Sequence, residues 1–346
     1  MIGTEILNGQ GLGNQLFAYV TARAIAKERG CEFGICNPEQ LGNNVHSGRG
    51  MYFMDIDIGK TISQDLKKKY KVWNDSDDRL FLGTSTADLQ NGIYVSGPDD
   101  SIHSVEDNTL LYGNLQDESY FGNYREDIKS WLKVKDEYDS YEYTRDDLCI
   151  INLRGGEYSG APELFLRRKY YVDAMRNMRK IRPDMKFMIV TDDEESAAKL
   201  LPGIEAHHFD MGKDYVTLKN ARYLILSNSS FAIFPSMTSD TVRFIIAPKY
   251  WARHNVSDGY WASEQNIYSF LNYQDRKGKL FTADECKEEL KIYKSRSKTY
   301  KTLGQKKNGA ALFMQKVHTR CIRASYWNGR ILRSLQRRVW GIFKKS

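Results

Sequence analysis

The sequence predicts an α/β protein of two domains with a parallel sheet, followed by a basic helical tail. Its 346 residues exceed what one hydrophobic core of ordinary size organises. From about residue 148 onward, short apolar runs alternate with helical stretches, which is the pattern of strands and helices in a parallel sheet. A hydrophobic fraction of 41% and a charged fraction of 27% are ordinary for a globular protein.

The chain opens with a predicted strand, loop and helix. The apolar run 2–7 is the strand, and the glycine-rich segment 9–13 is the loop. Residues 14–29 place apolar side chains on one side of a helix, which Gly30 ends. The following segment, residues 31–119, is polar and irregular, and its pattern predicts no element.

The second half contains four predicted strands separated by helices. The strands are residues 148–153, 186–190, 221–226 and 244–247, and the helices include 167–179, a helix ending at 200, and 215–220. Ligands of parallel sheets bind beyond the carboxyl ends of the strands. Polar clusters follow three of these strands, at residues 154–158, 191–194 and 227–230. Their shared position predicts a ligand site at this edge of the sheet.

The glycine loop, Gly9 to Gln15, leads from a strand into a helix. Glycines let a backbone approach a ligand closely, and a helix N-terminus favours an anion. The segment lacks the full spacing of a dinucleotide-binding loop and the Gly-Lys-Ser/Thr of a P-loop. A tight turn that serves only packing is an equally weighted alternative.

Arg154 follows a buried strand and precedes two glycines. A fixed arginine can neutralise a diphosphate leaving group without a metal ion, because charge builds on the phosphate as it departs. The alternative is a structural ion pair with Glu157 or an aspartate.

The other two clusters also have two interpretations each. Asp192 and Asp193 suit a helix N-cap, and a carboxylate there could also accept hydrogen bonds from a base or a ribose. The segment 227–230 offers small donors and amides to phosphate oxygens, or it is a polar turn that begins the next helix.

No metal or disulfide framework is predicted. The five cysteines are odd in number and form no C-x-x-C pair, which predicts reduced thiols. Asp55 and Asp57 form a D-x-D in an alternating segment, where facing water is the favoured interpretation. The histidines lack metal-ligand spacing, and His207 and His208 are interpreted as a surface pair.

Three ordered motifs resemble one known family. GLGNQLF at 11–17 is similar to the G-L-G-N-Q-M-F opening of glycosyltransferase family 11, the α-1,2-fucosyltransferases. NLRGGEY at 152–158 resembles the family's H-x-R-R-G-D-Y motif. SNSSF at 227–231, followed by IAPKYW at 246–251, resembles its S-N-S-S-F-S-W-W-G and I-A-P-K-x-W stretch. Order and spacing agree over roughly residues 5–251, so the combination is far more specific than any one motif.

The resemblance implies a GT-B-like fold of two Rossmann-like domains, and the charge pattern adds a basic amphipathic helical C-terminal tail. Residues 1–145 would form the N-terminal, acceptor-side domain, 146–285 the donor-binding domain and 286–346 the tail. The implied reaction moves L-fucose from GDP-β-L-fucose to a glycan hydroxyl, with inversion to an α-1,2 linkage and no metal or other cofactor. A role in bacterial surface polysaccharide or O-antigen synthesis would follow.

The resemblance also implies a set of site residues. Arg154 and Glu157 are the expected catalytic residues. The expected donor-binding residues are Gly11, Gly13, Asn14, Gln15, Asn152, Arg154, Asp192, Asn228, Ser229, Ser230 and Phe231. A base could be Glu157 or Glu163, or the leaving phosphate could take the proton itself.

Four departures from the family pattern leave alternatives open. Ile-Phe-Pro at 233–235 stands where the family has W-W-G. Asn152 stands where the family has His, Gly155 where it has a second Arg, and Glu157 where it has Asp. One positive charge is therefore missing unless a residue of the segment 167–169 (Arg, Arg, Lys) replaces it. A transferase for a different nucleotide sugar, or a non-catalytic nucleotide- or glycan-binding protein, are the alternatives.

The charge is uneven along the chain. The overall formal charge is +7, yet residues 290–346 contain 16 of the 51 Lys and Arg and no acidic residue. Within 314–346, basic residues interleave with large apolar ones at near-helical spacing, which predicts an interfacial helix on anionic lipid. Alternatives are a helix packed on the acidic body, or nucleic-acid binding, for which no accompanying fold is recognised.

The start of the sequence shows no signal peptide, and no apolar run reaches the length of a membrane span. The expected location is therefore cytoplasmic, peripheral on the inner face of the cell membrane.

Overall fold

The computed structural model describes residues 1–44, 47–75, 78–80, 93–95, 97–257, 259–261 and 263–296, together with 317, 320 and 321. Of the predicted interfacial helix, 314–346, residues 317, 320 and 321 are described and the rest lies outside the described residues. Within the described part of the chain, every helix is too short or too polar to cross a bilayer.

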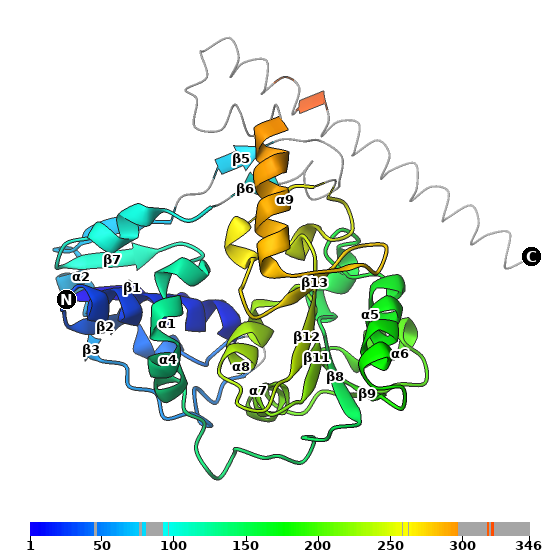
Figure 1. Cartoon of the computed structure of the whole chain (residues 1–346). Helices are drawn as coiled ribbons and strands as arrows, with labels where there is room; N and C mark the ends of the chain where they lie inside the picture. Colours follow the sequence, from blue (N-terminus) through cyan, green and yellow to red (C-terminus); the bar gives the residue numbers. More distant parts are fainter. Residues whose placement is uncertain are drawn as a thin grey trace, which may run out of the picture.

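Two parallel sheets lie side by side, the first in blue and cyan and the second in green and yellow (Figure 1). The first has the order β3-β2-β1-β7-β4, and all its strand pairs are parallel. Its strands are β1 (Ile2–Glu5), β2 (Phe33–Cys36), β3 (Lys60–Thr61), β4 (Lys71–Asn74) and β7 (Thr109–Tyr112). A separate antiparallel pair is formed by β5 (Asp78–Leu80) and β6 (Ile93–Val95).

The second sheet has the order β10-β9-β8-β11-β12-β13-β14, and its last pair alone is antiparallel. Its strands are β8 (Leu148–Leu153), β9 (Lys186–Thr191), β10 (Glu205–His207), β11 (Tyr223–Ile225), β12 (Phe244–Pro248), β13 (Asn272–Gln274) and β14 (Leu280–Phe281). The order reverses direction at β8, where a doubly wound sheet opens a crevice for a ligand. The predicted class, α/β with two Rossmann-like units, is confirmed.

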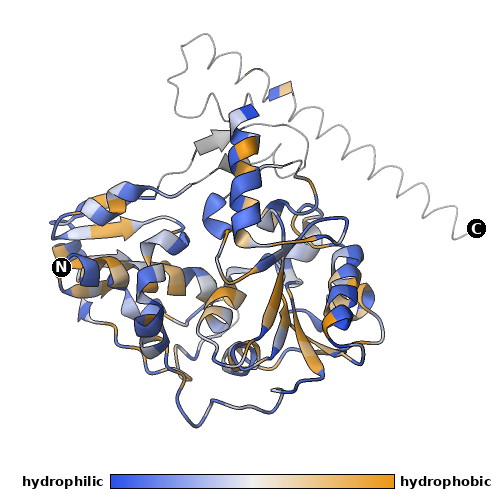
Figure 2. Cartoon of the chain, viewed as in Figure 1, coloured by the Kyte–Doolittle hydropathy of each residue, from blue (hydrophilic) through white to orange (hydrophobic). Residues whose placement is uncertain are grey.

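The helices are α1 (Leu12–Glu28), α2 (Gln64–Lys67), α4 (Arg125–Trp131), α5 (Arg168–Ile181), α6 (Glu194–Leu200), α7 (Met211–Lys219), α8 (Ile233–Met237) and α9 (Ala283–Arg296). The strands of the second sheet are coloured mostly hydrophobic in Figure 2, whereas α5 and α9 carry many hydrophilic residues. This contrast follows from position, because central parallel strands are covered on both faces and the helices face water on one side.

Helix α1 joins the two halves of the molecule. Thirteen of its 17 residues are buried, far more than the single stripe of a surface helix. It packs on β1 and β2 of the first sheet, and Phe17 meets Phe234 of α8 with ring centroids 4.7 Å apart. One cluster of buried apolar residues therefore includes side chains from both halves. This continuous core fixes the glycine loop against the second sheet.

The sequence missed most of the first sheet and three strands of the second. β3, β4 and β10 are short and carry exposed or half-buried side chains, so they present no apolar run. The predicted helix 215–220 begins earlier, at Met211, because Asp210 caps it by accepting a hydrogen bond from the amide of Lys213.

Candidate functional site

A cavity of about 390 Å³ lies between the two sheets, at the carboxyl ends of β8, β9 and β11. Its lining comprises Gly9, Gly11, Leu12, Gly13, Asn14, Asn44, Asn152, Leu153, Arg154, Glu157, Tyr158, Val190, Thr191, Asp192, His208, Met211, Asp214, Ser229, Ser230 and Phe231. All three predicted polar clusters and the glycine loop therefore contribute to one cavity.

Gly13 brings the glycine loop onto the serine loop of the second half, residues 227–231. A Cβ at this position would lie 2.4 Å from the amide nitrogen of Phe231 and 2.4 Å from the carbonyl carbon of Ser230. Both neighbours are backbone atoms, so a larger residue could not be accommodated by a side-chain rotation. Gly11 precedes α1 and provides no side-chain cap, and the first residues of α1, Leu12 to Asn14, line the cavity.

Arg154 leaves the end of β8 and is held on the cavity wall by two carboxylates. Its Nη2 lies 3.0 Å from Oε1 of Glu157, and its Nη1 lies 2.7 Å from Oδ2 of Asp192. Its side chain is 19% exposed. The sequence offered a structural ion pair and a ligand-facing position as alternatives for Arg154, and the structure shows both.

Asp192 also shapes the loop that follows Arg154. Its Oδ1 accepts a hydrogen bond of 2.7 Å from the amide of Gly155. Gly156 has a φ of 33°, and a Cβ there would lie 2.6 Å from Oδ2 of Asp192. The neighbouring Asp193 is the helix cap, since its carboxylate accepts hydrogen bonds from the amide and hydroxyl of Ser196. Asp193 therefore takes the helix-cap role, and the proposed contact of Asp192 with a base or ribose stays a prediction.

Asn152 and the serine loop form the back of the cavity. The hydroxyl of Ser227 donates a 3.0 Å hydrogen bond to Oδ1 of Asn152. Ser229, Ser230 and Phe231 line the cavity, and the short 3₁₀ turn Ser230–Ala232 begins there. This arrangement brings the serine loop to the cavity directly beside the glycine loop.

Two predicted donor-binding residues lie outside the cavity lining. Gln15 is fully buried, and its amide bonds to the backbone of Gln40, Gly42 and Asn43. Asn228 turns its Nδ2 to the carbonyl of Leu164. Gln15 therefore supports the loop that carries Asn44 to the cavity, and Asn228 supports the segment after β8.

Four lining residues lie outside the glycine loop, the serine loop, the predicted strands and the other predicted polar clusters: Asn44, His208, Met211 and Asp214. His208, interpreted from sequence as half of a surface pair, faces the cavity. Its Nδ1 lies 3.2 Å from Oδ2 of Asp214, and Oδ1 of Asp214 accepts a hydrogen bond from the amide of Phe209. Burial raises the pKa of Asp214 to about 7, an effect that the nearby imidazole opposes.

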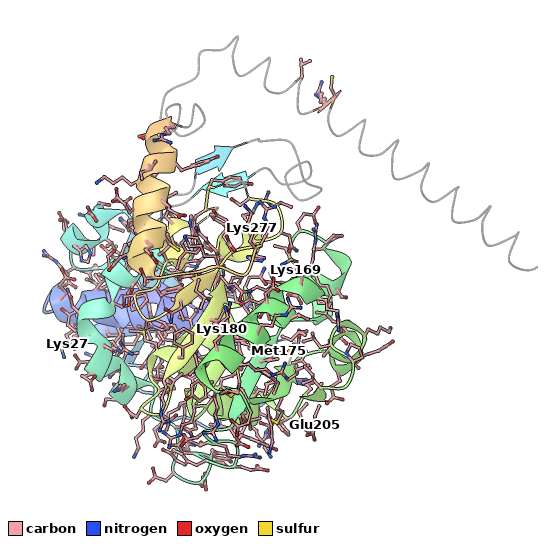
Figure 3. The ribbon with its side chains drawn as sticks, turned by 45° about the vertical axis from the view of Figure 1, so that its right-hand side comes forward. Lys27, Lys169, Met175, Lys180, Glu205 and Lys277 are labelled. Atoms are coloured by element: carbon pink, nitrogen blue, oxygen red, sulfur yellow. The ribbon has the colours of Figure 1, made fainter. Side chains whose placement is uncertain are left out.

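The candidate replacements for the missing positive charge also lie elsewhere. Arg167 and Arg168 are exposed and outside the lining, and Lys169, at the start of α5 (Figure 3), pairs with Asp173. Glu163, the second candidate base, is 7% exposed and likewise outside the lining. Arg154 is the one Arg or Lys among the described lining residues.

Among the described residues, no three His, Cys, Asp or Glu side chains gather as metal ligands would. Asp57 of the D-x-D instead pairs with Arg23, whose Nη2 lies 3.0 Å from its Oδ2.

Comparison with known proteins places the chain near glycosyltransferases. No family model matches it. It is 23% identical over 266 residues to an alpha-1,2-colitosyltransferase of Escherichia coli, across 70% of this chain and 89% of the relative.

Two solved structures are distantly similar. The fucosyltransferase NodZ from Bradyrhizobium has 14% identity and a TM-score of 0.40, covering 70% of this chain and 94% of that chain. POFUT1 in complex with GDP-fucose has 11% identity and a TM-score of 0.36, covering 71% and 98%. These scores are too low to transfer any ligand. The sequence comparison therefore shows a chain that is similar to a glycosyltransferase, the alpha-1,2-colitosyltransferase.

Proposed function

We propose that this chain is a glycosyltransferase that binds a GDP-sugar in the cavity between its two sheets. The observation that carries the proposal is the convergence of Arg154, the start of α1 and the serine loop on one cavity. A guanidinium and uncapped backbone amides are the groups that bind phosphate oxygens. The similarity to a colitosyltransferase over 70% of the chain supports the same class of reaction.

The donor's diphosphate would lie beside Arg154 and the Ser229–Phe231 loop. Its nucleobase would reach Asp214, the buried carboxylate of the lining. Guanine presents two adjacent N–H donors on its pairing edge, which a carboxylate can accept together. Uracil presents one N–H between two carbonyls, which a carboxylate would repel. This chemistry favours GDP over UDP.

The reaction would invert the anomeric carbon. The acceptor hydroxyl oxygen bonds to C1 of the sugar while the bond from C1 to the β-phosphate oxygen breaks, and GDP leaves with the electron pair. Arg154 would stabilise the charge that grows on that phosphate, so no metal is needed. The hydroxyl proton goes to the carboxylate of Glu157 or to the leaving phosphate. Replacing Glu157 with Gln decides between them, since unaltered turnover would remove Glu157 as the base.

Within this class we propose L-fucose as the sugar, an α-1,2 linkage and a role in bacterial surface polysaccharide or O-antigen synthesis. The motif at 11–17 and the position of Arg154 support this choice. The colitosyltransferase favours a second candidate, because colitose is L-fucose without its 3-hydroxyl. Presenting GDP-fucose and GDP-colitose in competition separates the two.

The decisive experiment follows nucleotide release from GDP-fucose, GDP-mannose and UDP-sugars in EDTA with mixed glycan acceptors. Release from GDP-fucose in EDTA would support the proposal, and release only from another donor would retain the transferase and discard fucose. Should no donor turn over, calorimetry with GDP distinguishes a binding protein from a chain without a donor site.

Arg154→Ala should lower kcat by roughly a hundredfold to a thousandfold, the usual loss when one donor to a developing oxyanion is removed. Because Ala leaves Asp192 without its cation, Arg154→Lys serves as the better-folded comparison. Lysine keeps the charge and loses the planar fork, so it should recover only part of the rate. Full activity of the lysine variant would show that charge alone is required.

The basic segment 314–346 would hold the enzyme on the inner face of the cell membrane, close to lipid-linked acceptors. Sedimentation with anionic liposomes, with and without the residues after Met314, tests this part of the proposal. Equal sedimentation of the two forms would remove it.

A further inference from the structure

A chain of three side-chain amides runs from the interior to the cavity. Nδ2 of Asn266 donates a 2.8 Å hydrogen bond to Oε1 of Gln116, and Nε2 of Gln116 donates a 3.2 Å hydrogen bond to Oδ1 of Asn14. The three residues come from the 3₁₀ turn Glu264–Asn266, the loop after β7 and the first turn of α1. Asn14 lines the cavity, whereas Gln116 and Asn266 do not.

The inner end of this chain is held firmly. Asn266 is 5% exposed, and its backbone carbonyl accepts a 2.8 Å hydrogen bond from the hydroxyl of the fully buried Tyr273. Its Nδ2 also donates to the hydroxyl of Tyr268, at 3.2 Å. Because Asn266 occupies the oxygen of Gln116, the nitrogen of Gln116 is the atom that faces Asn14.

The backbone before Gln116 is held in an unfavourable conformation. Leu115 has a φ of 52°, a region that a branched residue rarely adopts. Its amide donates a 2.9 Å hydrogen bond to Asp75, and its carbonyl accepts a 2.9 Å hydrogen bond from Thr21. Strain of this kind persists where the surroundings over-determine a conformation, often beside a functional residue.

We propose that Gln116 is a positioning residue of the donor site, one that orients Asn14. With its oxygen engaged by Gln116, Asn14 presents its NH₂ group to the cavity as a donor for a phosphate or ribose oxygen of the nucleotide. The reverse orientation would place a carbonyl oxygen against the anionic diphosphate. This inference rests on the proposed function, because it assumes a nucleotide in this cavity.

Gln116→Glu tests the inference, because a carboxylate accepts hydrogen bonds and donates none. The introduced carboxylate can still accept from Asn266, but it forces Asn14 to turn its NH₂ group inward and its oxygen toward the nucleotide. We expect the Kd for GDP to rise about tenfold to a hundredfold, the loss for a hydrogen bond to a charged group. Gln116→Met, which removes both hydrogen bonds without adding a charge, should raise it less.

Two further variants separate orientation from charge. Asn114→Asp adds a carboxylate in the same loop at an exposed position, and it should change the Kd by less than about threefold. In an Asn14→Ala background, Gln116→Glu should raise the Kd for GDP by no more than Asn114→Asp does, because no amide at position 14 remains to be reversed. The inference would be overturned if Gln116→Glu weakened GDP binding as much in the Asn14→Ala background as in the unsubstituted chain. Unchanged GDP binding by Gln116→Glu alone would also overturn it.

Thermal unfolding of each variant shows whether the fold is retained, and a structural role alone would lower Tm equally in both backgrounds. If the unsubstituted chain binds no GDP, the proposed function fails and this inference fails with it. If the unsubstituted chain binds GDP and Gln116→Glu binds it equally well, the inference alone is wrong.

Discussion

The two halves of the molecule contribute different chemistry to the same cavity. The second half supplies charged side chains, namely Arg154, Glu157, Asp192 and Asp214, after the ends of strands and on α7. The first half supplies glycines and two asparagines, Asn14 and Asn44. The difference teaches that charge recognition resides in one half, whereas the other half provides close backbone approach and neutral donors.

The largest expected effect in this comparison comes from Gly13→Ala. The added Cβ would meet backbone atoms of Ser230 and Phe231 at 2.4 Å, so the glycine loop and the serine loop must separate. We expect GDP binding to weaken by more than about tenfold and Tm to fall, because overpacking of a tight contact costs on the order of 1–3 kcal/mol. Calorimetry and thermal unfolding measure both.

Gly48→Ala is the matched control for Gly13→Ala. It lies in the same half, and a Cβ there meets no atom within 4 Å. It should leave GDP binding unchanged. Equal behaviour of the two variants would show that the close approach at Gly13 is unimportant for the cavity.

A second, intermediate effect is the pH dependence introduced by Asp214. Burial raises its pKa to about 7, so the protonated form becomes populated below that pH and can no longer accept two N–H donors. GDP binding should therefore weaken as the pH falls from 8 to 6. The Kd should rise by up to about tenfold between pH 7 and pH 6. Asp214→Asn should bind GDP weakly and with little dependence on pH over this range.

The same raised pKa also affects the stability of the protein without ligand. Between the pKa that Asp214 has in the unfolded chain and pH 7, the folded chain holds a proton on Asp214 that the unfolded chain has lost. The stabilising contribution of this proton is therefore present at low pH and is lost as the pH rises through 7. Asp214→Asn should accordingly raise Tm more at pH 8 than at pH 5. The opposite order would show that Asp214 ionises normally and is stabilised by His208.

The smallest effect concerns the contact that joins the two halves beside α7. The hydroxyl of Tyr52 donates a 2.5 Å hydrogen bond to Asp210 and accepts one of 2.9 Å from the amide of Gly212. Tyr52→Phe should lower the free energy of unfolding by about 1 kcal/mol and weaken GDP binding a few-fold. Tyr141→Phe, at a side chain that is 56% exposed, is the control and should change neither.

How far the sequence predicted the molecule differs between two strands of the second sheet, β8 and β10. β8 was predictable because all six of its residues are apolar or buried, and a central parallel strand reads as a continuous run. β10 has three residues, Glu, Ala and His, and none is fully buried. Without that strand, the polar cluster after it could not be recognised as a strand end, and His208 and Asp214 were missed.

The motifs predicted which segments meet, and they could not predict which face of each segment points inward. Asn14 and Gln15 are adjacent in sequence, and successive helical residues point about 100° apart. Asn14 therefore reaches the cavity, whereas Gln15 is fully buried beneath the loop 40–43. Asn228 and Ser229 differ in the same way, because the chain turns between them into the segment that begins at Ser230.

The shared position of α1 has a consequence for how the enzyme must release its product. Because α1 packs on the first sheet and on α8 of the second half within one continuous core, a rigid rotation of one half away from the other would expose Phe17 and its neighbours to water. The two halves should then melt in a single calorimetric transition, and neither should be soluble when expressed alone. Exit of the nucleotide would depend on local movement of the segments bearing Asn44 and Arg154, with the sheets themselves staying in place.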